Sequence, residues 1–385
     1  MKYAQAISLH LVLLFVCPGV WGQAVPADPQ PGSAPAATQP ASPEPENIWS
    51  AGPINFSGLV DVYYSSNFNH PASRINALRN FDVKANQFSL NMAKLTLEHT
   101  ADPVGFRVDF GFGRAFETMH ASEPADGPNV LRNIEQAYLS VKPKGWKGLQ
   151  LDFGQYVTSA GAEVIETSSN WNYSRSLLFA LAIPYYHFGV RASLPVGQHF
   201  SAGVHLANGW NNVEDNNSGK TVGLMAVWSG KLASWTNTYH VGREQAGDLG
   251  GLRHLYDTTL LLTPSPKANF YINFDYGADR NPLGPNRRWV GVAGAARFAL
   301  NSQFAIAPRL EWFNDADGFA TGSVQRLKEF TLTGEYKMRQ GFLTRLEYRR
   351  DWSDRPFFER GAVPGVFKNQ DTILLGFVAY FGPKR

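Results

Sequence analysis

The stretch FLTRLEYRRD, residues 342–351, alternates between two kinds of side chain with a period of two. Because successive side chains of a β-strand point to opposite faces, this stretch predicts a strand with two unlike faces. One face carries uncharged and mostly apolar side chains, namely Phe342, Thr344, Leu346 and Tyr348. The other face carries charged side chains, namely Arg345, Glu347, Arg349 and Asp351. Such a strand separates an apolar environment from a polar one.

The same division recurs in 106–113, 186–193 and 269–276. In the first of these, Phe110 falls on the apolar phase, whereas Arg107 and Asp109 fall on the polar phase. A soluble β-sandwich alternates in the same way, so the period alone does not decide between a membrane barrel and a secreted domain.

From Asn55 onward, no apolar stretch has the length of a membrane helix, so a membrane role must come from strands. We predict sixteen strands, each close to the ten residues that a tilted transmembrane strand requires. Their predicted ranges are 55–64, 86–99, 105–116, 131–142, 148–157, 183–194, 199–208, 220–229, 233–241, 254–263, 268–277, 288–300, 303–313, 327–337, 341–351 and 370–381.

The connections between these strands alternate strictly between short and long. Short turns rich in Pro, Gly and Ser fall at 102–103, 143–145, 195–197, 229–231, 264–266, 301–302 and 339–340. A sandwich has no reason to keep this alternation, because both of its ends meet the same solvent. We therefore predict an all-β protein: a transmembrane antiparallel β-barrel of about sixteen strands, with short periplasmic turns and long external loops.

Aromatic residues fall near the predicted strand ends, where amphipathic rings prefer the headgroup level of a membrane. They are Trp146, Trp228, Trp235, Tyr256, Trp289, Trp312 and Trp352. The last strand places Ile373, Phe377 and Phe381 on one phase, which resembles the C-terminal signal read by the barrel-assembly machinery. Such signals usually stop at the aromatic residue, whereas 382–385 follow it here.

The N-terminus predicts export. Lys2 precedes an apolar stretch at 6–16 and small residues at 19–24, which is the order of a cleaved secretory signal. We place the signal peptide at 1–22, a Pro- and Ala-rich periplasmic tether at 23–47 and the barrel at 48–385. Cys17 would be acylated in a lipoprotein, but the bulky Val16 before it argues against that alternative.

The net charge of +3 is spread along the chain, and this excludes the basic stripe of a nucleic-acid-binding protein. No familiar catalytic motif occurs, and the histidines are dispersed without ligand spacing. The oxygen-rich loops at 214–219 and 315–318 are explained by turn chemistry, although calcium is the alternative. We therefore expect no enzyme activity, no cofactor and no metal site.

The longest connection lies between the fifth and sixth predicted strands, within the run GAEVIETSSNWNYSRSLLFALAIPYYHFGVR, residues 161–191. Through Glu163, the stretch 170–176, Pro184 and the strand start 187–191, this run resembles the OmpL-like β-barrel porin-2 family of Gram-negative outer membranes. The resemblance implies an outer-membrane porin and not an enzyme.

The same connection predicts a pore constriction. An external loop containing Leu177, Leu178 and Phe179 would expose an apolar patch to water, so we expect 158–182 to fold into the lumen. The expected constriction residues are Glu163, Glu166, Asn170 and Arg175. The expected wall residues are Arg107, Asp109, Arg191, Arg309, Arg345, Glu347 and Arg349. These charges either form a transverse field that sorts solutes or tie the loop to the wall.

The lumen-phase charges nearly balance, which predicts a passive diffusion channel for small hydrophilic solutes and ions with a slight anion preference near Arg345 and Arg349. The alternative is a barrel that acts as an adhesin or scaffold through external loops such as 65–85 and 353–368. The sequence marks no subunit interface, so it leaves open both a homotrimer and a monomer.

Overall fold

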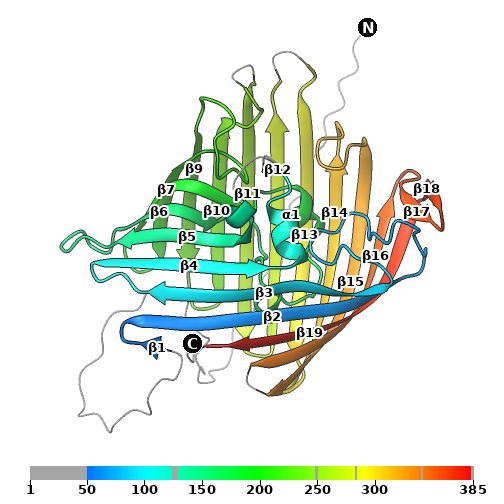
Figure 1. Ribbon diagram of the computed structural model, residues 1–385, viewed down its shortest axis with the longest axis horizontal. Coiled ribbons are helices and arrows are strands. Elements are labelled where there is room, and N and C mark those ends of the chain that lie inside the picture. Colours follow the sequence, from blue (N-terminus) through cyan, green and yellow to red (C-terminus); the bar gives the residue numbers. More distant parts are fainter. Residues whose placement is uncertain (1–49, 124–128, 248–249, 282–283, 340, 383–385) are drawn as a thin grey trace, which may run out of the picture. The chain divides into compact units, whose positions relative to one another are not determined.

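The computed structural model describes residues 50–123, 129–247, 250–281, 284–339 and 341–382. The expected signal peptide and most of the expected tether lie outside these residues, and so do the last three residues of the chain. The described part is one antiparallel sheet that closes on itself when the last strand pairs with the first. Figure 1 shows these two strands, β2 and β19, side by side.

The prediction of a sixteen-stranded barrel is confirmed, with each predicted strand matched by an observed one. The barrel strands are β2 (Ile54–Asn67), β3 (Gln87–His99), β4 (Val104–Phe112), β5 (Ile134–Val141), β6 (Gln150–Val157), β7 (Tyr186–Pro195), β8 (Phe200–Ala207), β9 (Thr221–Ser229), β10 (Ala233–Arg243), β11 (Leu252–Ser265), β12 (Ala268–Asp279), β13 (Arg287–Ala299), β14 (Phe304–Asp315), β15 (Gln325–Arg339), β16 (Phe342–Ser353) and β19 (Asn369–Phe381). Three shorter strands lie outside this set: β1 (Ser50–Ala51), β17 (Phe358–Arg360) and β18 (Val363–Phe367).

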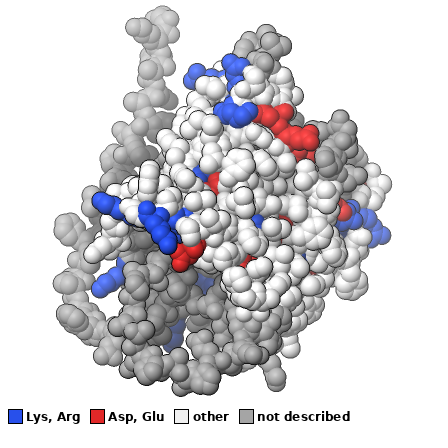
Figure 2. Space-filling model, turned by 60° about the vertical axis from the view of Figure 1, so that its left-hand side comes forward, with Lys and Arg blue, Asp and Glu red and all other residues white. Residues whose placement is uncertain are grey.

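The two faces of the barrel wall follow the alternation of the sequence. In β16, Arg345, Glu347 and Arg349 each have 1% of their surface exposed and point to the inside. Leu346 lies between the first two of these and is 58% exposed on the outside. Figure 2 shows the result on one side of the molecule, where acidic and basic side chains gather near the rims and few interrupt the broad surface between them. This surface suits the hydrocarbon of a bilayer.

The connections alternate between short and long with one exception. At one end of the barrel they are short, at 100–103, 196–199, 230–232, 266–267, 300–303 and 340–341, and at the other end they are longer. The exception is 142–149 at the first end, which is longer than 280–286 at the other. By the rule for outer-membrane barrels, the end with the short connections is periplasmic. Among the described residues, no helix is both long enough and apolar enough to cross a bilayer.

Three long connections fold into the barrel from the external end. Phe81 in the connection 68–86, Phe116 in α1 (Arg114–Met119) and Leu177 in the connection 158–185 are at most 2% exposed and belong to one apolar cluster. The cluster also contains Leu343 of β16 and Val378 of β19, so the packed part of the interior extends from these connections toward the opposite end of the barrel.

Two details differ from the sequence predictions. The third strand ends at Phe112 and not at 116, because Gly113 adopts a φ of 122° and the chain turns into α1. Trp289 was expected at the membrane interface, but it is fully buried inside the barrel. Its indole N–H donates to the carbonyl of Ala182 at 3.1 Å, and its ring stacks on Phe319 at 4.2 Å. A buried polar partner therefore outweighs the preference of this indole for the headgroup level.

Candidate functional site

The connection 158–185 between β6 and β7 crosses the inside of the barrel. Its two ends lie together, because the backbone N–H of Thr158 donates to the carbonyl of Tyr185 at 2.9 Å. Between them it forms η2 (Thr167–Ser169) and α2 (Leu177–Leu181). Its polar contacts reach β14, β15 and β16, which lie opposite β6 and β7 in the closed strand order, and also β2 and β3, which lie nearer to β6.

Two wall carboxylates bind backbone amides of this loop. Glu347 of β16 accepts from the N–H groups of Tyr173 at 2.6 Å and Ser174 at 2.9 Å. Glu311 of β14 accepts from the N–H of Leu177 at 3.0 Å, at the first residue of α2. Amides in the first turn of a helix have no partner within the helix, so the carboxylate stabilises the start of α2.

Three wall arginines bind backbone carbonyls of the loop, and each is at most 1% exposed. Arg345 reaches the carbonyls of Thr167, Asn170 and Asn172, Arg309 reaches that of Ser174, and Arg349 reaches that of Arg175. Their charges are also balanced within the wall, since Arg345 pairs with Glu335 at 2.7 Å and Arg309 pairs with Glu329 at 3.2 Å. The inward-facing charged side chains of β14 and β16 therefore bind the backbone of the loop, and carboxylates of β15 balance the charge of the arginines among them.

Of the four expected constriction residues, Glu163 and Asn170 form hydrogen bonds that join separate parts of the loop to one another. One oxygen of Glu163 accepts from Arg309 at 2.6 Å, and the other accepts from the N–H of Ser176 at 2.6 Å. Asn170 bridges the backbone of Val164, accepting from its N–H at 2.9 Å and donating to its carbonyl at 2.7 Å. Both side chains lie within the folded loop and are 6% exposed.

Arg175, the third expected constriction residue, is 1% exposed. Its guanidinium donates to the carbonyls of Val164, Ile165 and Tyr173, and it lies over the ring of Phe81 at 4.9 Å. Burial lowers the pKa of Arg175 from its ordinary value, which the nearby carboxylates of Asp61 and Glu163 oppose. The five N–H donors of the guanidinium suit it to gather several carbonyls of one loop.

Glu166, the fourth, forms an ion pair with Lys94 of β3. Burial acts to raise the pKa of Glu166, but Lys94 outweighs it and holds that pKa at about 2. Lys94 also lies 3.0 Å from Glu135 and 3.6 Å from Asp109, so one ammonium serves three carboxylates. This group fixes the loop to the wall on the side of β3.

The expected wall residues fall into two groups. Arg309, Arg345, Glu347 and Arg349 lie under the loop, as described above. Arg107 on β4 and Arg191 on β7 do not contact it, and their side chains are 18% and 32% exposed. Arg107 pairs with Asp109 at 3.0 Å, and Arg191 pairs with Asp152 at 2.8 Å. These two arginines therefore place partly exposed positive charge on β4 and β7, away from the loop.

Two anchors, Lys94 and Asp61, were not singled out from the sequence. Asp61 of β2 is fully buried and accepts from the hydroxyl groups of Thr167 and Tyr173, each at 2.5 Å, and from the side-chain amide of Asn91 at 2.6 Å. The signal was present in the stretch Leu59–Tyr63, where Asp61 interrupts an otherwise apolar strand on its inward phase. A lone inward carboxylate in a barrel strand thus indicates a polar partner inside.

Comparisons with known proteins agree with this architecture. The model of the family described as "Putative beta-barrel porin-2, OmpL-like" matches residues 53–381. No curated protein shows significant similarity to the chain.

Three solved structures share the fold. A trimer form of in-vitro folded OmpT, an outer membrane protein of Vibrio cholerae, aligns with a TM-score of 0.58 and 12% identity over 85% of this chain and 99% of that one. The outer membrane channel DcaP of Acinetobacter baumannii aligns with a TM-score of 0.58 and 12% identity over 87% and 99%. An anion-selective porin from Comamonas acidovorans aligns with a TM-score of 0.56 and 10% identity over 85% and 99%. At such identities the likeness shows the fold.

The family match spans nearly the whole described barrel, from the first barrel strand to the last. The outer face of the wall is apolar, and the solved structures of the same fold include outer-membrane channels. The protein is therefore an outer-membrane barrel, and the chain belongs to the family of OmpL-like β-barrel porins.

Proposed function

We propose that the protein is a passive diffusion channel for small hydrophilic solutes and ions, whose lumen is narrowed by the loop 158–182. One observation carries the proposal: the loop leaves the wall at β6 and is anchored on the opposite wall, at β14, β15 and β16. A segment held at both sides of a lumen sets the width of the path beside it. Passive diffusion through that path requires no catalytic group.

The charges that face this path are not those that hold the loop. Arg107, Arg191 and Arg297 have side chains that are 18%, 32% and 19% exposed, on β4, β7 and β13. Arg191 and Arg297 each pair with a carboxylate that is 4% exposed, so their positive ends extend toward water, whereas Arg107 also lies 3.5 Å from Glu98, whose side chain is 39% exposed. Because pore-lining charge sets the preference for ions, we place the slight anion preference at these arginines, and not at Arg345 and Arg349.

Planar-bilayer recording of the purified, refolded protein tests the channel itself. We expect discrete channel events with an anion permeability slightly above that for cations. A barrel that behaves as a folded membrane protein but produces no events would support the adhesin or scaffold function instead.

A homotrimer is the assembly that we propose, by likeness to the trimer form of OmpT from Vibrio cholerae, and chemical cross-linking in detergent tests it.

The substitution Arg191→Gln tests the assignment of selectivity. Asp152 keeps its bonds from Ser140 at 2.5 Å and Gln150 at 2.8 Å, so the wall should stay folded. We expect the anion-to-cation permeability ratio to fall about twofold, measured as the reversal potential in a salt gradient. Arg288→Gln is the matched control, because Arg288 is exposed at the external end of β13. An equal shift in both variants would refute a lumen role for Arg191.

The substitution Arg175→Ala tests whether Arg175 is a charged group at the pore surface or a structural residue that binds backbone carbonyls of its own loop. Since Arg175 is buried against carbonyls of its own loop, we expect frequent brief closures and a noisier open level. The reversal potential should stay within error of the unsubstituted protein, because the charge is shielded from the path. A shift of that potential toward cations with a quiet open level would place Arg175 at the pore surface.

A further inference from the structure

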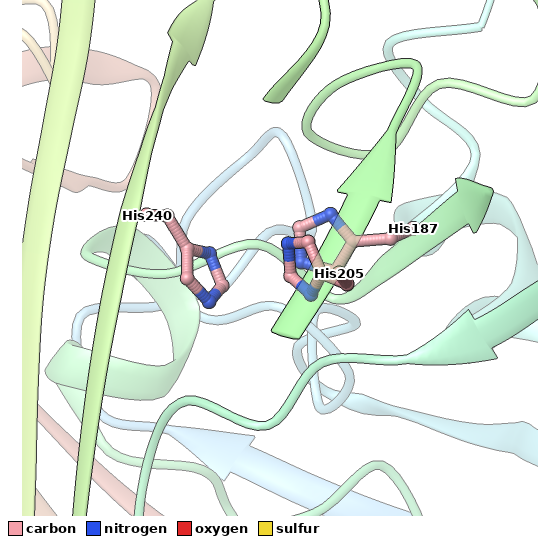
Figure 3. A group of neighbouring side chains, drawn as sticks. All are labelled: His187, His205 and His240. Carbon is pink, nitrogen blue, oxygen red and sulfur yellow. The ribbon is translucent and has the colours of Figure 1, made fainter. Parts of the chain in front are cut away.

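Three histidines from three barrel strands meet on the inside of the wall. They are His187 of β7, His205 of β8 and His240 of β10, and Figure 3 shows their rings turned toward one another. The ring centres are separated by 4.5 Å, 5.0 Å and 4.9 Å. One nitrogen of each ring lies within 4.8 Å of a nitrogen of both others. The expectation that the histidines lie apart is therefore wrong for these three.

The sheet register explains how they meet. His205 and His240 both pair with Gly223 of β9, so they lie at one level on either side of a residue without a side chain. A Cβ atom at Gly223 would lie 2.3 Å from two atoms of the His205 ring. Gly223 therefore provides the space over β9 into which the ring of His205 extends. His187 completes the group from β7, the strand next to β8. Gly189 of β7 pairs with Ala207 of β8, and His187 and His205 each lie two residues before this pair in their own strands.

The nitrogens that face this centre have no hydrogen-bond partner among the residues that the structure describes. The Nδ1 atom of His187 lies 3.0 Å from the carbonyl of Gly209, so it carries the proton and leaves the lone pair on Nε2. That Nε2 atom, the Nε2 atom of His205 and both ring nitrogens of His240 are buried and unpaired. Leaving these four buried ring nitrogens without a partner is costly unless they bind a ligand.

We propose that His187, His205 and His240 form a binding site for one borderline divalent transition-metal ion, such as Zn²⁺. Neutral imidazole is a preferred ligand of these metals, and a site with three histidines leaves a fourth position for water. The bond from His187 to the carbonyl of Gly209 is the second-shell contact that orients a ligating ring. None of the three ligands is a carboxylate, which disfavours Mg²⁺ and Ca²⁺.

The geometry is close to that required. Zn–N bonds of about 2.0–2.1 Å in a tetrahedral arrangement place the nitrogens roughly 3.3 Å apart. Because the nitrogens lie within 4.8 Å of one another, ring rotations that bring them closer by at most about 1.5 Å complete the site. The nearest cation, Arg191, is paired with Asp152 at 2.8 Å and lies over the ring of Tyr156 at 4.6 Å. Its charge is thus partly balanced before a metal ion binds. A bound ion would cross-link β7, β8 and β10, and this proposal does not depend on conduction.

Metal titration of the full-length, refolded protein in detergent tests the site. After treatment with a chelator, we expect one Zn²⁺ per chain by elemental analysis, and Co²⁺ should give the visible absorption of a four- or five-coordinate ion. His205→Asn and His240→Asn should each weaken Zn²⁺ binding by on the order of 100-fold, since losing a ligand costs at least as much as losing a second-shell partner. His199→Asn is the control, because His199 lies in an exposed turn.

Folding of each variant is verified by its altered migration on gels before boiling, and two separate ligand variants guard against the loss of one through misfolding. The proposal is overturned if the unsubstituted protein binds no stoichiometric Zn²⁺. It is also overturned if both ligand variants are folded and bind as tightly as the control. Loss of Zn²⁺ in the ligand variants with unchanged channel events would support the site without bearing on the proposed function.

Discussion

Replacing residues 161–182 with a short Gly-Ser linker should raise the single-channel conductance at least about twofold, because the segment that crosses the lumen is removed. The linker can be short, since Thr158 and Tyr185 are already joined by a backbone hydrogen bond. The wall strands close through their own ladder, and the charges of Arg345 and Glu347 would become hydrated instead of buried and unpaired.

Planar-bilayer recording measures this change, and replacement of 361–366 with the same linker is the matched control. Those residues are exposed and form the turn of the hairpin β17–β18 together with most of β18, within the external connection between β16 and β19. We expect the control to conduct like the unsubstituted protein. If deletion of 161–182 leaves the conductance unchanged, the loop does not limit the path, and the roles proposed for Glu163, Glu166 and Asn170 must be withdrawn.

Arg345→Ala should loosen the loop without opening the barrel. Arg345 is 1% exposed and binds three loop carbonyls, so its loss leaves those acceptors buried without a donor. We expect a cost of about 3 kcal/mol in the free energy of unfolding, together with long-lived high-conductance substates. Single-channel recording and protease cleavage within 161–182 report on the loop, and the temperature at which migration on gels changes reports on the barrel.

The matched control is Arg297→Ala. Arg297 pairs with the same carboxylate, that of Glu335, at 2.8 Å, but none of its contacts reaches the loop. Because its side chain is 19% exposed, we expect its loss to cost about 1 kcal/mol or less, with an undisturbed open level. Equal substates in the two variants would mean that the loss of a partner for Glu335, and not the loss of the loop contacts, causes the effect.

The barrel could be predicted from the sequence because its two determinants are local. Alternation such as that of 342–351 assigns each side chain to a face, and the short connections assign the strand ends. The inward fold of 158–185 followed from Leu177, Leu178 and Phe179, which could not remain exposed. The predicted end of one strand, 105–116, was wrong because the chain turns at Gly113 and the strand stops at Phe112.

The partners inside the lumen could not be predicted, because they depend on which distant strands face each other across the barrel. Glu163 meets Arg309 at a separation of 146 residues along the chain, and Tyr173 meets Glu347 at a separation of 174. The histidine group was missed for a related reason. His205 and His240 are brought together by their shared pairing with Gly223, and no spacing rule for metal ligands includes a strand between two of them.

The anchoring of the loop at both the first and the last strands has a consequence for biogenesis. Thr167 needs Asp61 from the start of the barrel, and Tyr173 needs Glu347 from near its end. Neither half of the chain alone supplies both partners, so the complete set of loop contacts requires both β2 and β16 to be in place. On the function proposed above, a barrel whose loop has not yet docked would have a wider lumen than the finished protein and would conduct more.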